Sequence, residues 1–134
     1  MAFHWIAASN WKLSPTYSFQ RLRVHFDPAS RAATTLGTFG NDPEHTFQLR
    51  SHWDVTRKTA FDQLVSWTSG LSFSTLPGHT RLDVRLGRRV GESVEIGVAG
   101  QNLLRPGTME YLDVARLIAT QARRSVHGEV VWRF

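Results

Sequence analysis

Histidines and carboxylates are the residues in this sequence that could support metal or acid–base chemistry. The six histidines stand at positions 4, 25, 45, 52, 79 and 127. They form neither a His-Glu-x-x-His element nor another spacing typical of metal ligands. The chain also has no cysteine, which excludes disulfides and thiolate metal sites. The spacing therefore predicts no metal site, and we expect no cofactor.

Two carboxylates, Asp83 and Glu95, stand in neighbouring segments and could be mistaken for a catalytic pair. Arg81 and Arg85 flank Asp83, and this alternation of charge favours a ladder of ion pairs instead. The sequence contains no Gly-x-Ser-x-Gly element for a hydrolase nucleophile. Gly97-x-x-Gly100 lies within a segment, where small residues relieve crowding rather than bind phosphate. We therefore expect no enzymatic activity.

The segments that contain these residues alternate between apolar and polar residues with period two, and this pattern predicts β-strands. Seven such segments are expected, at residues 3–11, 16–26, 46–55, 59–68, 80–87, 93–102 and 125–134. In the second of them the apolar phase slips between Phe19 and Leu22. One extra residue exchanges the two faces of a strand, so the slip predicts a bulge near Gln20 and Arg21.

The connections between the segments alternate in length. Tight turns are expected at residues 12–15, 56–58 and 88–91, and longer loops at 27–44, 69–78 and 105–120. Short and long connections then lie at opposite ends of an up-and-down meander. Within the last loop, Tyr111, Val114, Ala115 and Ile118 have helical spacing, which suggests a helical turn.

Composition narrows the classes of protein. The chain has 134 residues, a net charge of +5 and 41% hydrophobic residues, which argues for one folded domain at most and against disorder. No apolar run is long enough for a membrane-spanning helix, and the N-terminus lacks the features of a signal peptide. The basic residues are 14 arginines with Lys12 and Lys58. They are scattered singly or at turns, which argues against nucleic-acid binding.

The positions of the aromatic residues distinguish a membrane barrel from a soluble one. Trp11, Tyr17, Trp53, Phe61, Trp132 and Phe134 are expected near the short turns, and Phe3, Trp5, Phe26, Phe47 and Trp67 towards the long loops. Aliphatic residues fill the middles of the segments. Two aromatic belts around an aliphatic band are typical of a lipid-facing barrel wall. A soluble β-barrel or sandwich that binds a small ligand remains the alternative.

The alternation also assigns residues to the two faces of the wall. Lumen-facing residues are expected to include Arg81, Asp83, Arg85, Glu95, Gln101, His127, Glu129 and Arg133. Val130, Trp132 and Phe134 are expected to face lipid in the last strand. Because the segments alternate in direction, the seventh should end on the short-turn side, at Phe134.

Several motifs resemble the C-terminal end of TonB-dependent outer-membrane receptors. They are Leu82 to Arg89, Val94 to Leu104 with its Gln101-Asn102-Leu103-Leu104 element, Met109-Glu110-Tyr111, and Arg124 to Phe134. Residues 41–51 resemble the strand that descends from an extracellular loop in that family. Arg105 differs from the acidic residue that often follows Asn-Leu-Leu.

This resemblance implies an all-β fold, an antiparallel meander that is a segment of a transmembrane barrel of about 22 strands. Residues 1–134 would be the C-terminal portion, with the plug domain and first barrel strands absent and any signal peptide lost with them. The full-length receptor would import ferric siderophores or other scarce nutrients across the outer membrane. Its partners would be lipid, the barrel-assembly machinery through Phe134, and TonB through the absent N-terminal part.

Ligand binding in this family implies extracellular loops as the site. Arg31, His45, His79 and Arg105 lie in or beside the three long loops and could meet an anionic ligand. Solvated loop charge is the alternative role for the same residues. The identity of the ligand does not follow from them.

Overall fold

The structure is a computed structural model that describes residues 1, 3–22, 42–71, 77–113 and 118–134. Its strands are β1 (Trp5–Ala8), β2 (Trp11–Phe19), β3 (His45–Thr56), β4 (Thr59–Thr68), β5 (His79–Val90), β6 (Val94–Gln101), β7 (Gly107–Asp113), β8 (Ile118–Arg123) and β9 (Ser125–Trp132). Over these ranges the chain forms no helix capable of crossing a membrane.

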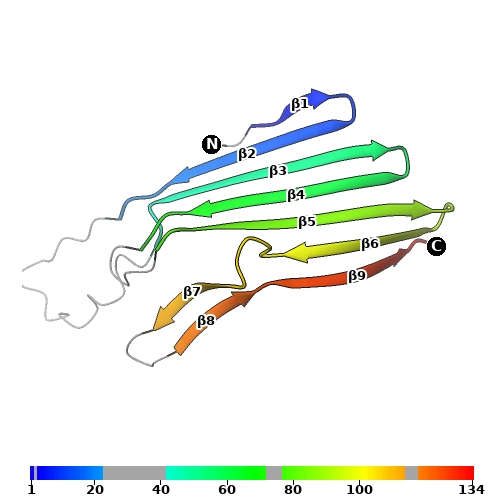
Figure 1. Ribbon diagram of the computed structural model, residues 1–134. Helices are drawn as coiled ribbons and strands as arrows, with labels where there is room; N and C mark the ends of the chain where they lie inside the picture. The colour runs from blue at the N-terminus through cyan, green and yellow to red at the C-terminus, as the bar shows by residue number, and fades with distance from the viewer. Residues whose placement is uncertain (2, 23–41, 72–76, 114–117) are drawn as a thin grey trace, which may run out of the picture.

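Seven strands form one antiparallel sheet in the order β1-β2-β3-β4-β5-β6-β9 (Figure 1). The strands β7 and β8 pair only with each other and form a hairpin between β6 and β9. The C-terminus lies at the short-turn end, where Arg133 N donates to Ser93 O at 2.8 Å. The predicted all-β meander of about seven strands is confirmed.

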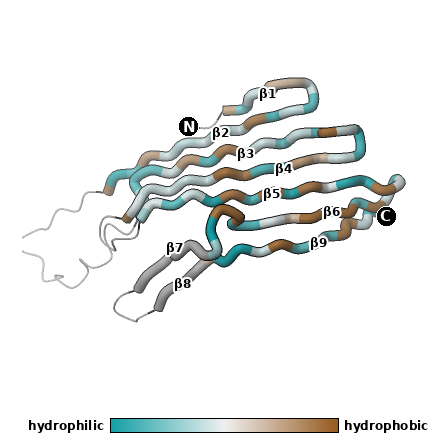
Figure 2. Tube along the Cα trace, viewed as in Figure 1, coloured by the Kyte–Doolittle hydropathy of each residue, from teal (hydrophilic) through white to brown (hydrophobic). Residues whose placement is uncertain are grey.

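Strand register sorts the side chains onto two faces, because directly opposed residues of an antiparallel ladder share a face. One row consists of Trp11, Trp53, Phe61, Leu86, Val98 and Gly128 and belongs to what we call the apolar face. The neighbouring row consists of Lys12, His52, Asp62, Arg85, Ala99 and His127 and belongs to the polar face. Figure 2 shows the resulting alternation of hydropathy along the strands.

The sheet is a single layer without a packed core. Among the described residues Ala99 is the one buried hydrophobic side chain, and Ser51 and Asn102 are the buried polar ones. Exposed apolar side chains include Trp53 at 41%, Ile96 at 46% and Val130 at 72%. A soluble sheet would cover such a face with a second layer. Here the apolar face is left open.

The first tight turn was predicted in the wrong place. Residues 12–15 lie inside β2, and the chain turns at Ser9 and Asn10 instead. Both residues favour turns, and Asn10 Nδ2 donates to Asp54 O at 3.0 Å, which joins this turn to the end of β3. Pro15 is accommodated within the strand, where its carbonyl accepts from Phe3 N at 3.0 Å.

Three other boundaries differ from expectation. The strand expected over 16–26 ends at Phe19, so residues 20–22 form no bulged strand, and residues 23–26 lie outside the described residues. The strand β5 continues to Val90, and the turn occupies residues 91–93, with Gly91 at φ 70°. The expected helical turn in 105–120 is wrong, because backbone pairing forms the β7–β8 hairpin there. Val114 and Ala115 lie outside the described residues.

The shifted first turn also changes the aromatic pattern. Tyr17 pairs with Phe47, which pairs with Trp67, so Tyr17 lies towards the long loops and not beside a short turn. Trp5 pairs with Leu13 near mid-height, and not towards the long loops. The rings near the short turns include Trp11, Trp53, Phe61 and Trp132, and those near the long loops include Tyr17, Phe47 and Trp67. The expected position of Phe26 lies outside the described residues.

Candidate functional site: the hollow of the polar face

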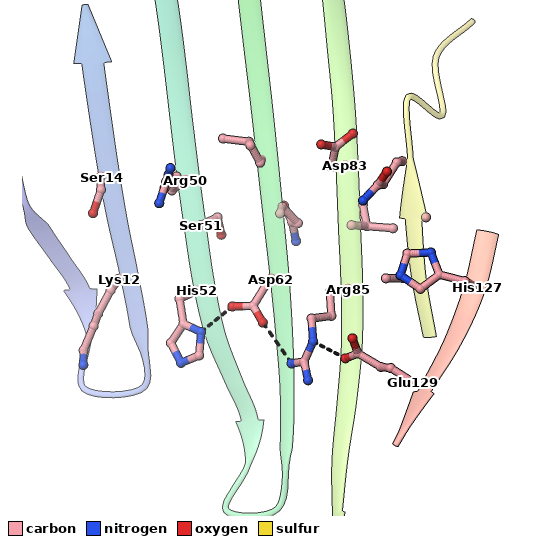
Figure 3. A pocket seen from close by; sticks show the side chains of 16 residues that line it. Lys12, Ser14, Arg50, Ser51, His52, Asp62, Asp83, Arg85, His127 and Glu129 are labelled. Atoms are coloured by element: carbon pink, nitrogen blue, oxygen red, sulfur yellow. Dashed lines mark hydrogen bonds and ion pairs between the residues drawn. The ribbon is translucent and has the colours of Figure 1, made fainter. Parts of the chain in front are cut away.

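A hollow of about 680 Å³ lies on the polar face across β2 to β6 and β9 (Figure 3). Its charged and histidine lining consists of Lys12, Arg50, His52, Asp62, Asp83, Arg85, His127 and Glu129. These residues come from the five strands β2, β3, β4, β5 and β9, so the surface joins residues as distant in the sequence as Lys12 and Glu129. Period-two alternation in each strand is what brings them to one surface.

Asp62 joins a histidine and an arginine side chain from the strands on either side of β4. Its Oδ1 lies 2.5 Å from His52 Nδ1, and its Oδ2 lies 3.5 Å from Arg85 Nη1. His52 Nε2 also lies 3.4 Å from Asp54 Oδ1 in the same strand. The register explains this arrangement, because Asp62 stands directly opposite both His52 and Arg85.

Arg85 is the centre of the network. Its Nη2 donates to Glu95 Oε1 at 2.6 Å, and its Nε donates to Glu129 Oε1. With Asp62, three carboxylates from three different strands therefore surround one guanidinium. Arg133 Nη2 extends the cluster at 3.5 Å from Glu95 Oε2.

Two opposed glycines make room for this cluster. Gly87 of β5 pairs with Gly97 of β6. A Cβ on Gly87 would lie 2.8 Å from Arg85 Nη1, and one on Gly97 would lie 2.8 Å from Glu129 Oε1. The side chains of the cluster can therefore cross the sheet directly above the backbone of the two glycines, which have no Cβ.

Asp83 belongs to a separate cluster at the loop end of the hollow. Arg81 Nε donates to its Oδ1 and Oδ2 at 2.9 and 3.0 Å, and Asn102 N donates to its Oδ1 at 2.8 Å. Asp83 and Glu95 therefore bind different arginines at different heights. Asp83 is paired with Arg81 and Glu95 with Arg85, as in a ladder of ion pairs. The two carboxylates do not share one site, as a catalytic acid–base pair would.

Lys12 and Arg50 stand apart from these networks at the β2–β3 side of the hollow. Within the described ranges neither forms an ion pair, and both are exposed. Register places Lys12 opposite His52 and Arg50 opposite Ser14. This side of the hollow therefore presents positive charge to whatever occupies it.

The structure places the expected lumen residues on one face. Arg81, Asp83, Arg85, Glu95, Gln101, His127 and Glu129 share the polar face by register, and Arg133 reaches Glu95 from beyond the end of β9. Val130 and Trp132 pair with Ile96 and Val94 on the apolar face, 72% and 71% exposed. Phe134 follows β9 and is fully exposed. Whether these faces meet water and lipid stays a prediction.

The four expected ligand residues are not brought together. His45 lies on the apolar face, where its Nδ1 is 2.8 Å from Tyr17 Oη and its ring centroid is 5.0 Å from that of Phe19. His79 pairs with Thr68, and register puts it on the polar face. Arg105 is exposed beyond β6. Arg31 lies outside the described residues, and ligand binding by these four stays a prediction.

Among the charged residues that line the hollow, Asp62 and Lys12 were not predicted to lie on the polar face. A clear signal for Lys12 was present in the sequence: Trp11, Leu13, Pro15 and Tyr17 alternate with Lys12, Ser14, Thr16 and Ser18. That pattern predicts a strand across Pro15 with Lys12 on the polar face. Asp62 lies in a segment where Gln63 interrupts the apolar face, which hid the alternation.

The arrangement is suited to a charged, wet surface. Over the described ranges, no three His, Asp or Glu side chains form a group that could hold a metal ion. Each carboxylate of the central cluster, Asp62, Glu95 and Glu129, has a cationic partner. These ion pairs link neighbouring strands and make this face of the sheet polar.

Fold and site together define a two-faced antiparallel wall of the kind that forms a segment of a β-barrel. Among solved structures, the chain resembles the ferric-catecholate import receptor Fiu from Escherichia coli K12 in its closed form, with a TM-score of 0.77 and 16% sequence identity. The match covers 99% of this chain and 20% of the receptor chain. No protein-family model and no curated protein matches the sequence. The resemblance is therefore one of fold.

Proposed function

We propose that residues 1–134 are the C-terminal portion of the barrel of a TonB-dependent receptor in the outer membrane of a Gram-negative bacterium. In this proposal the apolar face contacts lipid and the polar face lines a wet lumen. The plug domain and first barrel strands belong to a longer protein. That protein imports a small molecule, a ferric siderophore or another scarce nutrient, with energy delivered by TonB through its N-terminal part.

The observation that carries this proposal is the uncovered apolar face of a single-layer sheet whose fold matches an import receptor over 99% of the chain. Only Ala99 is a buried hydrophobic residue in the described part of the sequence. Water does not stabilise such a face, whereas lipid does. The motifs around Gln101-Asn102-Leu103-Leu104 and Phe134, which resemble the C-terminal end of TonB-dependent receptors, also support the proposal.

The two edge strands of the sheet, β1 and β9, indicate that further strands are needed to close a barrel. The strands β1 and β9 each pair on one side only within the sheet. Unpaired backbone groups in hydrocarbon cost several kcal/mol each, so barrels close. Strands of the longer receptor would pair with both edges. The barrel-assembly machinery would recognise Phe134 at the end of β9.

A solvent comparison tests the membrane proposal. The purified chain is diluted from urea into plain buffer or into detergent micelles, and folding is followed by circular dichroism and size-exclusion chromatography. We expect β-structure in micelles and aggregation in buffer. A monodisperse β-sheet monomer in buffer would contradict the proposal and favour a soluble β-barrel or sandwich that binds a small ligand.

A second experiment tests whether further strands are required. The chain is expressed behind a signal peptide, with and without the preceding part of a related receptor barrel. We expect a heat-modifiable outer-membrane species only for the longer protein. A folded monomer of the chain alone in purified outer membranes would overturn this part of the proposal.

A further inference from the structure

Asn102 is the most deeply buried side chain of the described residues, at 1% exposure, and it lies where β6 ends and the chain departs towards β7. Its backbone has a φ of 52°, in the left-handed region that asparagine tolerates better than most residues. A buried amide needs hydrogen-bond partners, and a positive φ is costly for most residues, so the surrounding contacts must hold Asn102 in this conformation.

The contacts of Asn102 join three parts of the molecule. Its backbone N–H donates to Asp83 Oδ1 of β5 at 2.8 Å, and its Nδ2 donates to Ala122 O of β8 at 2.8 Å. The next residue, Leu103, donates its N–H to Leu82 O at 2.9 Å. One asparagine thus connects the sheet to the base of the hairpin.

Asp83 is itself held in place. Arg81 binds both of its carboxylate oxygens, at 2.9 and 3.0 Å from Nε. The chain Arg81–Asp83–Asn102–Ala122 therefore runs from β5 to β8. Packing supports the same bend, because a Cβ on Gly100 would lie 3.0 Å from the side chain of Leu103.

In the part of the chain that the structure describes, few other backbone contacts attach the hairpin to the sheet. The strands β7 and β8 pair only with each other, and Figure 1 shows them diverging from β6 and β9. At its base, Arg124 N donates to Pro106 O at 3.3 Å, which closes the hairpin without tying it to β5. Among the described contacts, the two bonds of Asn102 link Ala122 of β8 to Asp83 of β5.

We propose that Asn102 is a positioning residue that holds the β7–β8 hairpin as a rigid arm in a fixed direction from the sheet. Asparagine meets both requirements of the position. Glycine accepts the positive φ but has no amide to donate to Ala122 O. Aspartate also accepts the φ, but its carboxylate cannot donate and would lie beside Asp83.

The absence of cysteine allows a direct test. Two cysteines replace Glu92, in the turn before β6, and Leu112, in β7, and carry spin labels. Electron–electron distance measurements then report the spread of hairpin directions. They are made on the folded chain in micelles or in buffer, whichever gives β-structure, so that the result is independent of the proposed membrane location.

We expect a narrow distance distribution with Asn102 and at least a twofold broader one in N102G, N102A and N102D. D83A, which removes the acceptor for the Asn102 N–H, should broaden it as well. Gln101→Ala changes the exposed neighbour and is the matched control, for which the width should not change. An unchanged width in folded N102G and N102A would overturn the proposal. Unfolding of every Asn102 variant would also overturn it, because the residue would then be required for the sheet itself.

Discussion

Arg85 of β5 binds Glu95 of β6 at 2.6 Å, although the residue directly opposite Arg85 is Ala99. The guanidinium reaches four residues along the neighbouring strand, past Gly87 and Gly97. The ion pair therefore runs diagonally across the sheet. Its geometry depends on both the charged groups and the two glycines between them.

Replacing Arg85 by methionine should lower the free energy of unfolding by about 1–3 kcal/mol, because Asp62, Glu95 and Glu129 lose a shared cation and repel one another. The measurement is urea unfolding in detergent micelles, followed by circular dichroism. R50M is the matched control, since Arg50 lies on the same face and forms no ion pair in the described part of the chain. Equal effects of the two substitutions would argue against a special role of Arg85.

The two glycines should differ in a double-mutant cycle with Arg85. The three atoms nearest to a Cβ on Gly87 belong to the side-chain ends of Arg85 and Glu95, whereas a Cβ on Gly97 would also lie 3.1 Å from the backbone oxygen of Leu86. We expect G87A to destabilise the wild-type chain but to have little effect in an R85A background. The penalty of G97A should partly remain there.

Gly128 provides the control for this series. A Cβ at this position would come no closer than 3.9 Å to its nearest neighbour, Gly97 O. G128A should change the free energy of unfolding by less than about 0.5 kcal/mol. A large loss in G128A, or an undiminished penalty of G87A without Arg85, would show that the glycines act through the strand backbone alone.

The tryptophans should report the depth of the apolar face in lipid. Trp53 belongs to the ring group near the short turns, Trp67 to the group near the long loops, and Trp5 lies between them opposite Leu13. In a longer receptor that ends with this chain, reconstituted in vesicles with one of these tryptophans as its single tryptophan, lipids brominated near the bilayer centre should quench Trp5 more than the other two. Efficient quenching of all three by aqueous iodide would place this face in water.

Removal of Phe134 should reduce assembly without reducing stability. The residue follows β9 and is fully exposed, so it contributes no packing to the sheet. In a longer receptor that ends with this chain, deleting it should lower the outer-membrane amount several-fold while leaving folding in micelles unchanged. L104A, at another exposed apolar residue (53%), is the control. Normal assembly without Phe134 would contradict the proposed role.

Strands whose faces alternate without interruption could be predicted from the sequence. The expected segments 59–68 and 93–102 differ little from β4 and β6. The strand β2 differs from the expected segment 16–26, because a tight turn was expected at residues 12–15, although the alternation continues across Pro15. The β7–β8 hairpin was missed because the spacing of Tyr111 and Ile118 fits a helix equally well.

The faces of the candidate site could be predicted, but its partners could not. Alternation alone put Arg85 and Glu95 on the polar face. Their contact also depends on the relative register of β5 and β6 and on the space at Gly87 and Gly97. The role of Asn102 was equally inaccessible, because it depends on a carbonyl, Ala122 O, that is 20 residues away.

A wall without a packed interior has a further consequence for how its sequence can vary. In an ordinary core, each side chain must fit the volume left by its neighbours. On the open apolar face, a larger or smaller hydrophobic residue displaces fluid surroundings and not a fixed neighbour. The shape is set by the backbone ladder, so it can persist while most residues change. A TM-score of 0.77 at 16% identity is what such tolerance allows.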